Sequence, residues 1–173
     1  MLDQDITPLN ADDLPAIDAL QAAAHVPELH EPRALFAAMI DYPHSICLGI
    51  RGGQGLRGYI LGYASRAERA DFTTGPEDSF DPGVLYLHDL CIAIEEQGAG
   101  LGKILYDAFE TRARRAGYTR LIANAIEGRL TFWENQGFTA GAQTTYHGVT
   151  ATRIEKTLSP AAANNTEKKD IAI

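Results

Sequence analysis

The sequence predicts a mixed α/β fold (α+β) in which about four helices flank one sheet. The main observation is a β-α-β unit over residues 84–126, made of an apolar strand, a glycine-rich turn, an amphipathic helix and a second strand. Strand hairpins are expected before and after this unit. Because the unit is not repeated, a doubly wound parallel fold is not favoured. The length of 173 residues and the hydrophobic content of 45% fit one domain with a buried core.

The first elements are a strand and two helices. Residues 6–9 indicate a short strand, and Asn10 is a suitable N-cap for the helix that follows. An apolar stripe supports this first helix, and its members are Leu14, Ile17, Leu20 and Ala24. A second, shorter helix is expected over residues 33–40, between two prolines that interrupt the chain.

A hairpin and a long loop come next. Residues 45–51 and 56–65 indicate two strands, and the GGQG sequence between them is typical of a hairpin turn. Residues 67–83 mix acids, glycine, proline and threonine. We expect this segment to be a loop, long enough to be a functional segment rather than a simple connection.

The central unit contains the strongest patterns. Residues 84–94 indicate an apolar strand, and residues 101–116 indicate a helix that ends at Gly117, a fitting residue after a helix terminus. The apolar face of this helix is expected to consist of Leu101, Ile104, Leu105, Ala108, Phe109 and Ala113.

The remaining elements close the sheet. We expect a strand over residues 120–126, a short helix over 130–136 and a second hairpin from strands over 138–145 and 151–158. The chain therefore divides into one domain over residues 1–158 and a tail over 159–173, whose composition is typical of disorder.

Charge and composition narrow the function. The net charge of −8 and the pI near 5.0 argue against nucleic acid or an anionic membrane as the main partner, because both require a cationic surface. The N-terminus does not have the pattern of a secretory signal, and no apolar run is long enough to span a membrane, so a cytoplasmic location is expected. Cys47 and Cys91 lie in apolar strands and are expected to be buried and reduced. No cysteine–histidine spacing indicates a metal site, so none is expected.

The glycine-rich segment 97–103 is the most informative part of the sequence. It reads Gln-Gly-Ala-Gly-Leu-Gly-Lys and lies between a strand and a helix. Glycines at such a turn let backbone N–H groups converge at a helix N-terminus, which is a binding site for phosphate. The segment is neither a Walker loop, because Ile104 follows Lys103, nor a dinucleotide fingerprint, because Lys103 takes the place of the third glycine. The alternative is a tight turn that binds nothing.

The spacing Gln97-x-x-Gly100-x-Gly102 resembles the acyl-CoA pyrophosphate signature of the GNAT superfamily of N-acetyltransferases. The LHDLCI segment upstream and the FWENQGF segment downstream are also similar to that superfamily. The resemblance implies acetyl-CoA as co-substrate and a primary amine of a small molecule or peptide as acceptor. It also implies a mostly antiparallel sheet, splayed at the strand before the loop. Similar proteins are often homodimers.

The resemblance also implies which residues bind the coenzyme. The backbone of Leu90, Cys91 and Ile92 would hold the pantetheine arm and the acetyl carbonyl, as an added strand would. The pyrophosphate site would consist of Gln97, Gly98, Ala99, Gly100, Leu101, Gly102 and Lys103.

Acetyl transfer needs a group that takes a proton from the amine. His88 and Asp89 interrupt the apolar strand and are the candidates, with Tyr86 a weaker one. Adjacent residues of a regular strand point to opposite faces, so both reach one site only if the strand is distorted. The alternative is that His88 is a structural, hydrogen-bonded residue.

The sequence departs from the superfamily pattern in two places. Trp133 stands where many members have the tyrosine proposed to protonate the leaving thiolate, and Tyr146 could serve instead. Glu127 stands where relatives often have an asparagine that binds pantetheine, and Asn124 could substitute. A non-catalytic acyl-CoA-binding or regulatory domain therefore stays open as an alternative, as does a longer acyl chain. His25, His30 and the nearby acids are interpreted as loop residues and not as metal ligands.

Overall fold

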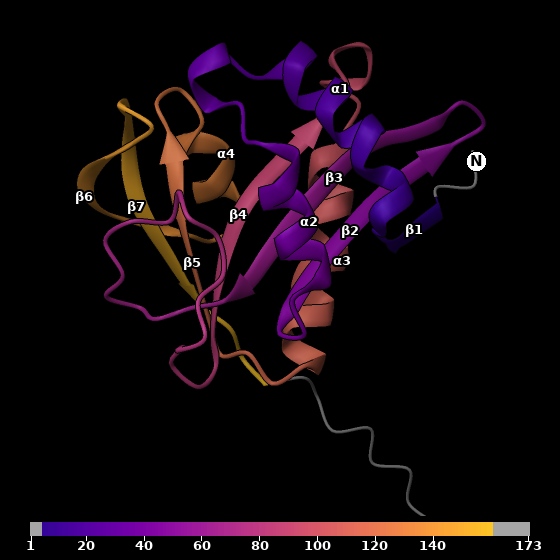
Figure 1. Ribbon diagram of the computed structural model, residues 1–173. Helices are drawn as coiled ribbons and strands as arrows, with labels where there is room; N and C mark the ends of the chain where they lie inside the picture. Colours follow the sequence, from indigo (N-terminus) through magenta and orange to yellow (C-terminus); the bar gives the residue numbers. More distant parts are fainter. Residues whose placement is uncertain (1–4, 161–173) are drawn as a thin grey trace, which may run out of the picture.

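The computed structural model describes residues 5–160, and seven strands form one sheet in it. Four α-helices accompany the sheet within these residues (Figure 1). The elements in chain order are β1 (Asp5–Pro8), α1 (Leu14–Ala24), α2 (Arg33–Asp41), β2 (Ser45–Gly52), β3 (Gly55–Ala64), β4 (Val84–Ile92), α3 (Leu101–Arg115), β5 (Arg120–Ile126), α4 (Leu130–Asn135), β6 (Thr139–Tyr146) and β7 (Val149–Thr157). The expected types and order of elements are confirmed, and the boundaries differ by one or two residues.

The sheet is antiparallel except at one place. Its strand order is β1-β2-β3-β4-β5-β7-β6, and only the β4–β5 pair is parallel. That pair is short, because β4 bonds to β5 over Val84–Leu87 and not over the rest of its length. Figure 1 shows the two strands diverging beyond this point. The mixed, mostly antiparallel sheet with a splay before the glycine-rich segment is therefore confirmed.

Helices cover both faces of the sheet and give two buried layers. α3 packs on one face together with Trp133 of α4, while α1 and α2 pack on the other (Figure 1). The second layer also contains Phe72, from the segment between β3 and β4, whose ring stacks on Tyr86 with 3.7 Å between centroids. Arg69 orders this segment, because its guanidinium donates to three groups between Asp71 and Gly75. The described part of the chain contains no helix long and apolar enough to cross a membrane.

The prediction that Ile104 belongs to the buried face of α3 is wrong. Ile104 is 38% exposed, whereas Tyr106, which was not expected on the apolar face, is buried. The buried face follows Leu101, Leu105 and Phe109 at four-residue spacing, and Ile104 lies beyond its edge. Tyr106 is accommodated because its hydroxyl donates to Glu110.

The N-terminal helix cap is confirmed, with a small difference. The Asn10 side chain accepts from the N–H of Asp12 at 2.8 Å, and the Asp13 carboxylate accepts from the N–H of Asn10 at 2.9 Å. This capping box begins a short 3-10 turn, Ala11–Asp13, which leads into α1. Of the expected C-terminal tail, Ser159 and Pro160 have no regular structure, and residues 161–173 lie outside the described part.

Both cysteines are buried and free, as expected. Burial raises the pKa of the Cys47 thiol to about 11 and that of the Cys91 thiol to about 12. Loss of water around a thiolate is the main cause in each case.

Gly62 of β3 lets α3 lie directly on the sheet. A Cβ added there would be 2.6 Å from the Phe109 ring and 2.9 Å from the Tyr86 carbonyl oxygen. Because the carbonyl cannot move without breaking the sheet, Gly62→Ala is expected to lower the free energy of unfolding by about 1–3 kcal/mol. Gly53→Ala adds the same methyl group where nothing lies within 4 Å. This control should change the free energy of unfolding by less than about 0.5 kcal/mol. Urea denaturation of both variants checks this, and equal effects would contradict it.

Candidate functional site

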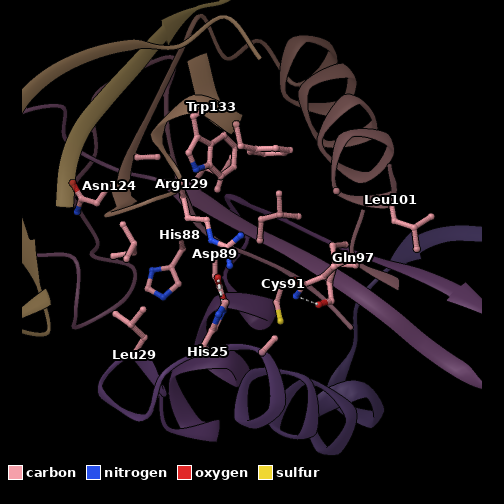
Figure 2. Close-up of a pocket in the computed structure, with 18 of the residues that line it drawn as sticks. His25, Leu29, His88, Asp89, Cys91, Gln97, Leu101, Asn124, Arg129 and Trp133 are labelled. Atoms are coloured by element: carbon pink, nitrogen blue, oxygen red, sulfur yellow. Dashed lines mark hydrogen bonds and ion pairs between the residues drawn. The ribbon is translucent and has the colours of Figure 1, made fainter. Parts of the chain in front are cut away.

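A cavity of about 660 Å³ lies in the splay between β4 and β5. Its walls come from the segment between α1 and α2, from β4, from the glycine-rich segment and the start of α3, and from β5 and α4. Figure 2 shows polar side chains meeting at its centre, with Trp133 on one side and Gln97 on another. Chain segments far apart in sequence therefore build one pocket at the point where the sheet opens.

The glycine-rich segment forms one end of the cavity. Gly98 and Gly100 have φ values of +82° and +84°, in the left-handed region that favours glycine. Gly100 is the N-cap of α3 and provides no side-chain cap, so the first N–H groups of the helix stay available to a ligand. The Gln97 amide donates to the Ile92 carbonyl at 3.1 Å and ties the segment to the end of β4. The local geometry is that of an anion-binding helix N-terminus.

The other expected residues of this segment have different surroundings. The Leu101 side chain belongs to the core beneath α3. Gly102 is helical, and a Cβ added there would make only ordinary contacts, at 3.7 Å to Ile92 and Phe132. Lys103 is exposed, and its ammonium pairs with Asp107 at 2.5 Å. Ala99 differs from the others, because it does not line the cavity in the described structure.

A β-bulge brings His88 and Asp89 to the same face of the sheet. Leu87 pairs with Gly62 of β3, and Asp89 pairs with Leu61, so His88 is the extra residue. The strand distortion that both side chains require is thus present. Beyond the bulge, β4 still pairs with β3 but not with β5. The backbone groups of Leu90–Ile92 that point toward β5 therefore have no strand partner, and these residues line the cavity.

Two side chains, His25 and Tyr59, hold Asp89. The His25 Nε2 atom lies 3.0 and 3.1 Å from the two carboxylate oxygens, and the Tyr59 hydroxyl donates at 2.8 Å. Burial alone would raise the pKa of Asp89, but His25 and Tyr59 outweigh it and lower the pKa. Burial would likewise lower the pKa of His25, but the Asp89 charge outweighs it and raises the pKa. The two residues form an ion pair in the wall of the cavity.

His88 belongs to a second polar cluster, which is almost completely enclosed. Its Nε2 atom lies 3.4 Å from Glu31 Oε1 and 3.4 Å from the Tyr146 hydroxyl. Tyr146 also donates to Glu31, and His147 Nε2 lies 3.1 Å from the same carboxylate oxygen. Burial would raise the pKa of Glu31, but the hydrogen bonds from His88, Tyr146 and His147 outweigh it and lower the pKa. Burial, assisted by neighbouring tyrosine and carboxylate charge, raises the pKa of Tyr146.

The β5 and α4 side of the cavity carries Trp133, at which the sequence departs from the superfamily pattern, and Asn124, the suggested substitute for the asparagine of that pattern. Trp133 is buried and packs edge-on against Tyr106 and Phe138, with ring centroids 5.9 and 5.4 Å apart. The Asn124 amide donates to the Tyr86 hydroxyl at 3.4 Å, and its Oδ1 atom is buried without a partner in the described structure. Both side chains line the cavity. Trp133 has the surroundings of a core residue at the wall of the pocket.

Arg129 adds a positive charge to the pocket. The residue precedes α4 by one position, lines the cavity and has no ion pair among residues 5–160. In Figure 2 its guanidinium extends into the centre of the pocket, toward Asp89. Its charge also reaches His25, where it opposes part of the rise in pKa that Asp89 causes. An unpaired guanidinium in a pocket is suited to an anionic group.

Among the cavity-lining side chains that the sequence alone did not assign to the site, three bear on its chemistry. They are His25, Glu31 and Arg129. Arg129 lies in the segment where members of the superfamily often have an asparagine. Its positive charge in that segment was the one sequence feature that could have indicated a site residue. For His25 and Glu31, the sequence offered only their polar character in a segment interrupted by two prolines, which does not indicate a functional site. Neither they nor any other His, Cys, Asp or Glu side chains of residues 5–160 gather in a group that could hold a metal ion.

Comparison with known proteins agrees with this geometry. The Acetyltransferase (GNAT) family matches residues 14–138. No match is found among curated proteins. The fold resembles the ribosomal-protein-S18-alanine N-acetyltransferase from Escherichia coli, with a TM-score of 0.72 at 16% identity over 93% of this chain and 97% of that one.

Two further solved structures show the same fold. The loading GNATL domain of CurA from Lyngbya majuscula has a TM-score of 0.78 at 13% identity, over 89% of this chain and 97% of that one. The yncA protein from Salmonella typhimurium, solved with its cofactor acetyl-CoA, has a TM-score of 0.70 at 19% identity, over 95% of this chain and 99% of that one. These identities support a shared fold, and the family match extends over more than half of the sequence. The chain belongs to the acetyltransferase (GNAT) family.

Proposed function

We propose that this protein transfers an acetyl group from acetyl-CoA to a primary amine of a small molecule, a peptide or a protein. The observation that carries the proposal is the opening between β4 and β5, where an unpaired strand edge, a helix N-terminus and two polar side chains meet. Two proteins with this fold support the proposal. The E. coli protein is named as an N-acetyltransferase, and the S. typhimurium protein was solved with acetyl-CoA.

The residues present fit coenzyme A. The start of α3 offers N–H groups and the positive end of the helix dipole to the pyrophosphate. Packing within the protein does not require glycine at position 102. Close approach of a phosphate to the backbone is a physical reason for a glycine there. The edge of Leu90–Ile92 has no strand partner and can bond to the pantetheine arm as a neighbouring strand would, while the Ile92 carbonyl already accepts from the Gln97 amide.

We assign the general base to His88. Asp89 is more accessible, with 19% of its side chain exposed against 1% for His88. However, both Asp89 oxygens accept hydrogen bonds and its pKa is lowered, which makes this carboxylate a weak base. The Nδ1 atom of His88 is buried without a partner in the described structure, in a side chain that lines the cavity, and an imidazole is a common proton acceptor in catalysis. Asp89 then keeps His25 in place beside the acceptor.

The reaction needs one bond to form and one to break. The amine nitrogen attacks the thioester carbonyl carbon, its proton passes to His88, and coenzyme A departs as a thiolate. Tyr146 is poorly suited to protonate this thiolate, because its hydroxyl donates to Glu31 and its pKa is raised. The Arg129 guanidinium instead stabilises the negative charge electrostatically. The thiolate is protonated by solvent after release, and the imidazolium of His88 returns its proton to solvent, so that the net products are the amide and coenzyme A thiol.

Coenzyme binding should depend on the left-handed conformation of Gly100. Gly100→Ala is expected to weaken binding of free coenzyme A by about tenfold, because the strained residue displaces the helix N-terminus that receives the pyrophosphate. Gly117→Ala is the matched control, since Gly117 has a φ of +88° at the opposite end of α3. Titration calorimetry measures both affinities, and an equal loss in the two variants would contradict a pyrophosphate site at Gly100.

Turnover should depend on His88. With acetyl-CoA and a panel of primary amines, we expect thiol release and an acetylated product, detected by mass spectrometry. His88→Ala is expected to lower kcat by about 10²–10⁴-fold without weakening coenzyme binding, because it removes the base and no coenzyme contact. Asp89→Asn should lower kcat less. Coenzyme binding without turnover on any amine would favour a non-catalytic domain, and a larger loss in Asp89→Asn would move the base to Asp89.

The charge of Arg129 should act on the chemical step. Arg129→Gln is expected to lower kcat about tenfold, equivalent to roughly 1.4 kcal/mol of transition-state stabilisation, while KM for acetyl-CoA stays the same. Arg115→Gln removes the same charge from an exposed position at the end of α3 and should leave both constants unchanged. A higher KM with an unchanged kcat in Arg129→Gln would instead indicate ground-state binding of the coenzyme.

A further inference from the structure

The carboxylate of Glu31 lies in the wall of the cavity, and its backbone is held by separate hydrogen bonds. Only 4% of its side chain is exposed, and one oxygen, Oε1, receives three polar groups from other parts of the chain. The other oxygen, Oε2, is buried without a partner in the described structure. A buried carboxylate is costly unless its partners hold it, so its position calls for an explanation.

We infer that Glu31 is a positioning residue, which fixes the proton of His88 on Nε2 and so leaves the lone pair on Nδ1 for the acceptor amine. This inference rests on the proposed acetyl transfer for its functional meaning. The tautomer itself can be measured whether or not the protein transfers an acetyl group.

The backbone of Glu31 is fixed independently of its carboxylate. The Gln21 side chain of α1 accepts from the Glu31 N–H at 2.8 Å and donates to the Glu31 carbonyl at 2.7 Å. Gln21 is itself buried, so both bonds are shielded from water. The backbone of Glu31 is therefore held without His88, and Tyr146 and His147 also bond its carboxylate, as a preorganised site requires.

The hydrogen-bond donors around Glu31 determine the tautomer of His88. The Tyr146 hydroxyl has one proton, and it is donated to Glu31 Oε1. Toward His88 Nε2, Tyr146 can therefore offer only an oxygen lone pair, and the carboxylate of Glu31 likewise only accepts. Both neighbours of Nε2 are acceptors, so the proton belongs on Nε2. A neutral imidazole then has its basic lone pair on Nδ1.

The same carboxylate supports the charged form of the base. When His88 takes a proton from the amine it becomes an imidazolium, and Glu31 Oε1 lies 3.4 Å from its Nε2 atom. This arrangement has the logic of a nucleophile–base–orienter relay, in which the third group holds the imidazole and does not itself take the proton. Glu31 suits this role, because its pKa is lowered and it stays ionised near neutral pH.

Glu31 also joins the two loops that face the acceptor side of β4. His147 lies in the turn between β6 and β7, and it has a φ of +48°, a value unusual for a residue other than glycine. Its imidazole bonds to Glu31 Oε1 at 3.1 Å, across from the segment between α1 and α2. Gly148, the other central residue of this two-residue hairpin turn, also has a positive φ, of +77°. Glu31 therefore bonds to the turn of the β6–β7 hairpin as well as lying beside His88.

The tautomer is tested by ¹⁵N NMR of the histidine side chains, with His88 assigned by its absence in His88→Ala. In the full-length protein at pH 8 we expect a protonated Nε2 and an unprotonated Nδ1 for His88. A proton on Nδ1 in the unmutated protein would overturn the inference outright, and this measurement requires no variant at the site to fold.

Glu31→Gln gives the second measurement. Without the carboxylate, we expect His88 to populate both tautomers and kcat to fall by about 10–100-fold, while KM for acetyl-CoA is unchanged. Glu110→Gln is the matched control, because Glu110 is also a shielded carboxylate bonded by a tyrosine, but it lies on α3 and does not line the cavity. It should keep the wild-type kcat and tautomer.

The outcomes separate this inference from the proposed function. If Glu31→Gln keeps a single Nε2–H tautomer, Glu31 does not position His88, and the inference fails even if acetyl transfer is found. If the unmutated protein transfers no acetyl group but shows the expected tautomer that Glu31→Gln loses, the proposed function fails and the positioning of His88 stands.

Discussion

The structure depends on a strand that is paired on one side only. β4 lies in the middle of the sheet, yet beyond Leu87 it loses its bonds to β5 while keeping those to β3. Backbone N–H and C=O groups in a protein interior need partners, so a central strand with a free edge is stable only where a cavity or a ligand adjoins it. The bulge at His88, the short parallel pairing and the cavity are consequences of this one opening.

The opening divides the pocket into two chemical halves. Toward α3 the surface consists of backbone N–H groups and glycine, which suits phosphate oxygens. Toward α1 and the β6–β7 turn it consists of the Asp89–His25 ion pair and of Glu31 beside the His88 imidazole. Arg129 lies between the halves (Figure 2). A thioester that entered from the first half would meet its acceptor at the boundary, where β4 bends.

The sequence predicted the parts of this arrangement that depend on local pattern. Helix and strand types, the helix N-terminus after Gly100 and the apolar run of β4 all follow from periodicity and glycine placement within a short window. Ile104 was misplaced because a stripe read from apolar residues alone ignores a tyrosine that is buried with its hydroxyl bonded to Glu110. His25 and Glu31 were missed for a different reason. They meet residues 64 and 115 positions away, and no local pattern encodes such contacts.

The buried cysteines have a practical consequence for work on the protein. Thiolate is the form that attacks disulfides, and at neutral pH a thiol with a pKa of about 11 or 12 contains almost none of it. Cys91 is enclosed as well, with only 1% of its surface exposed, although it adjoins the cavity. The thiols of the native protein should therefore react very slowly with chromogenic disulfide reagents and with alkylating agents. Any rapid colour in such a reaction reports coenzyme A itself, or a chain that has unfolded.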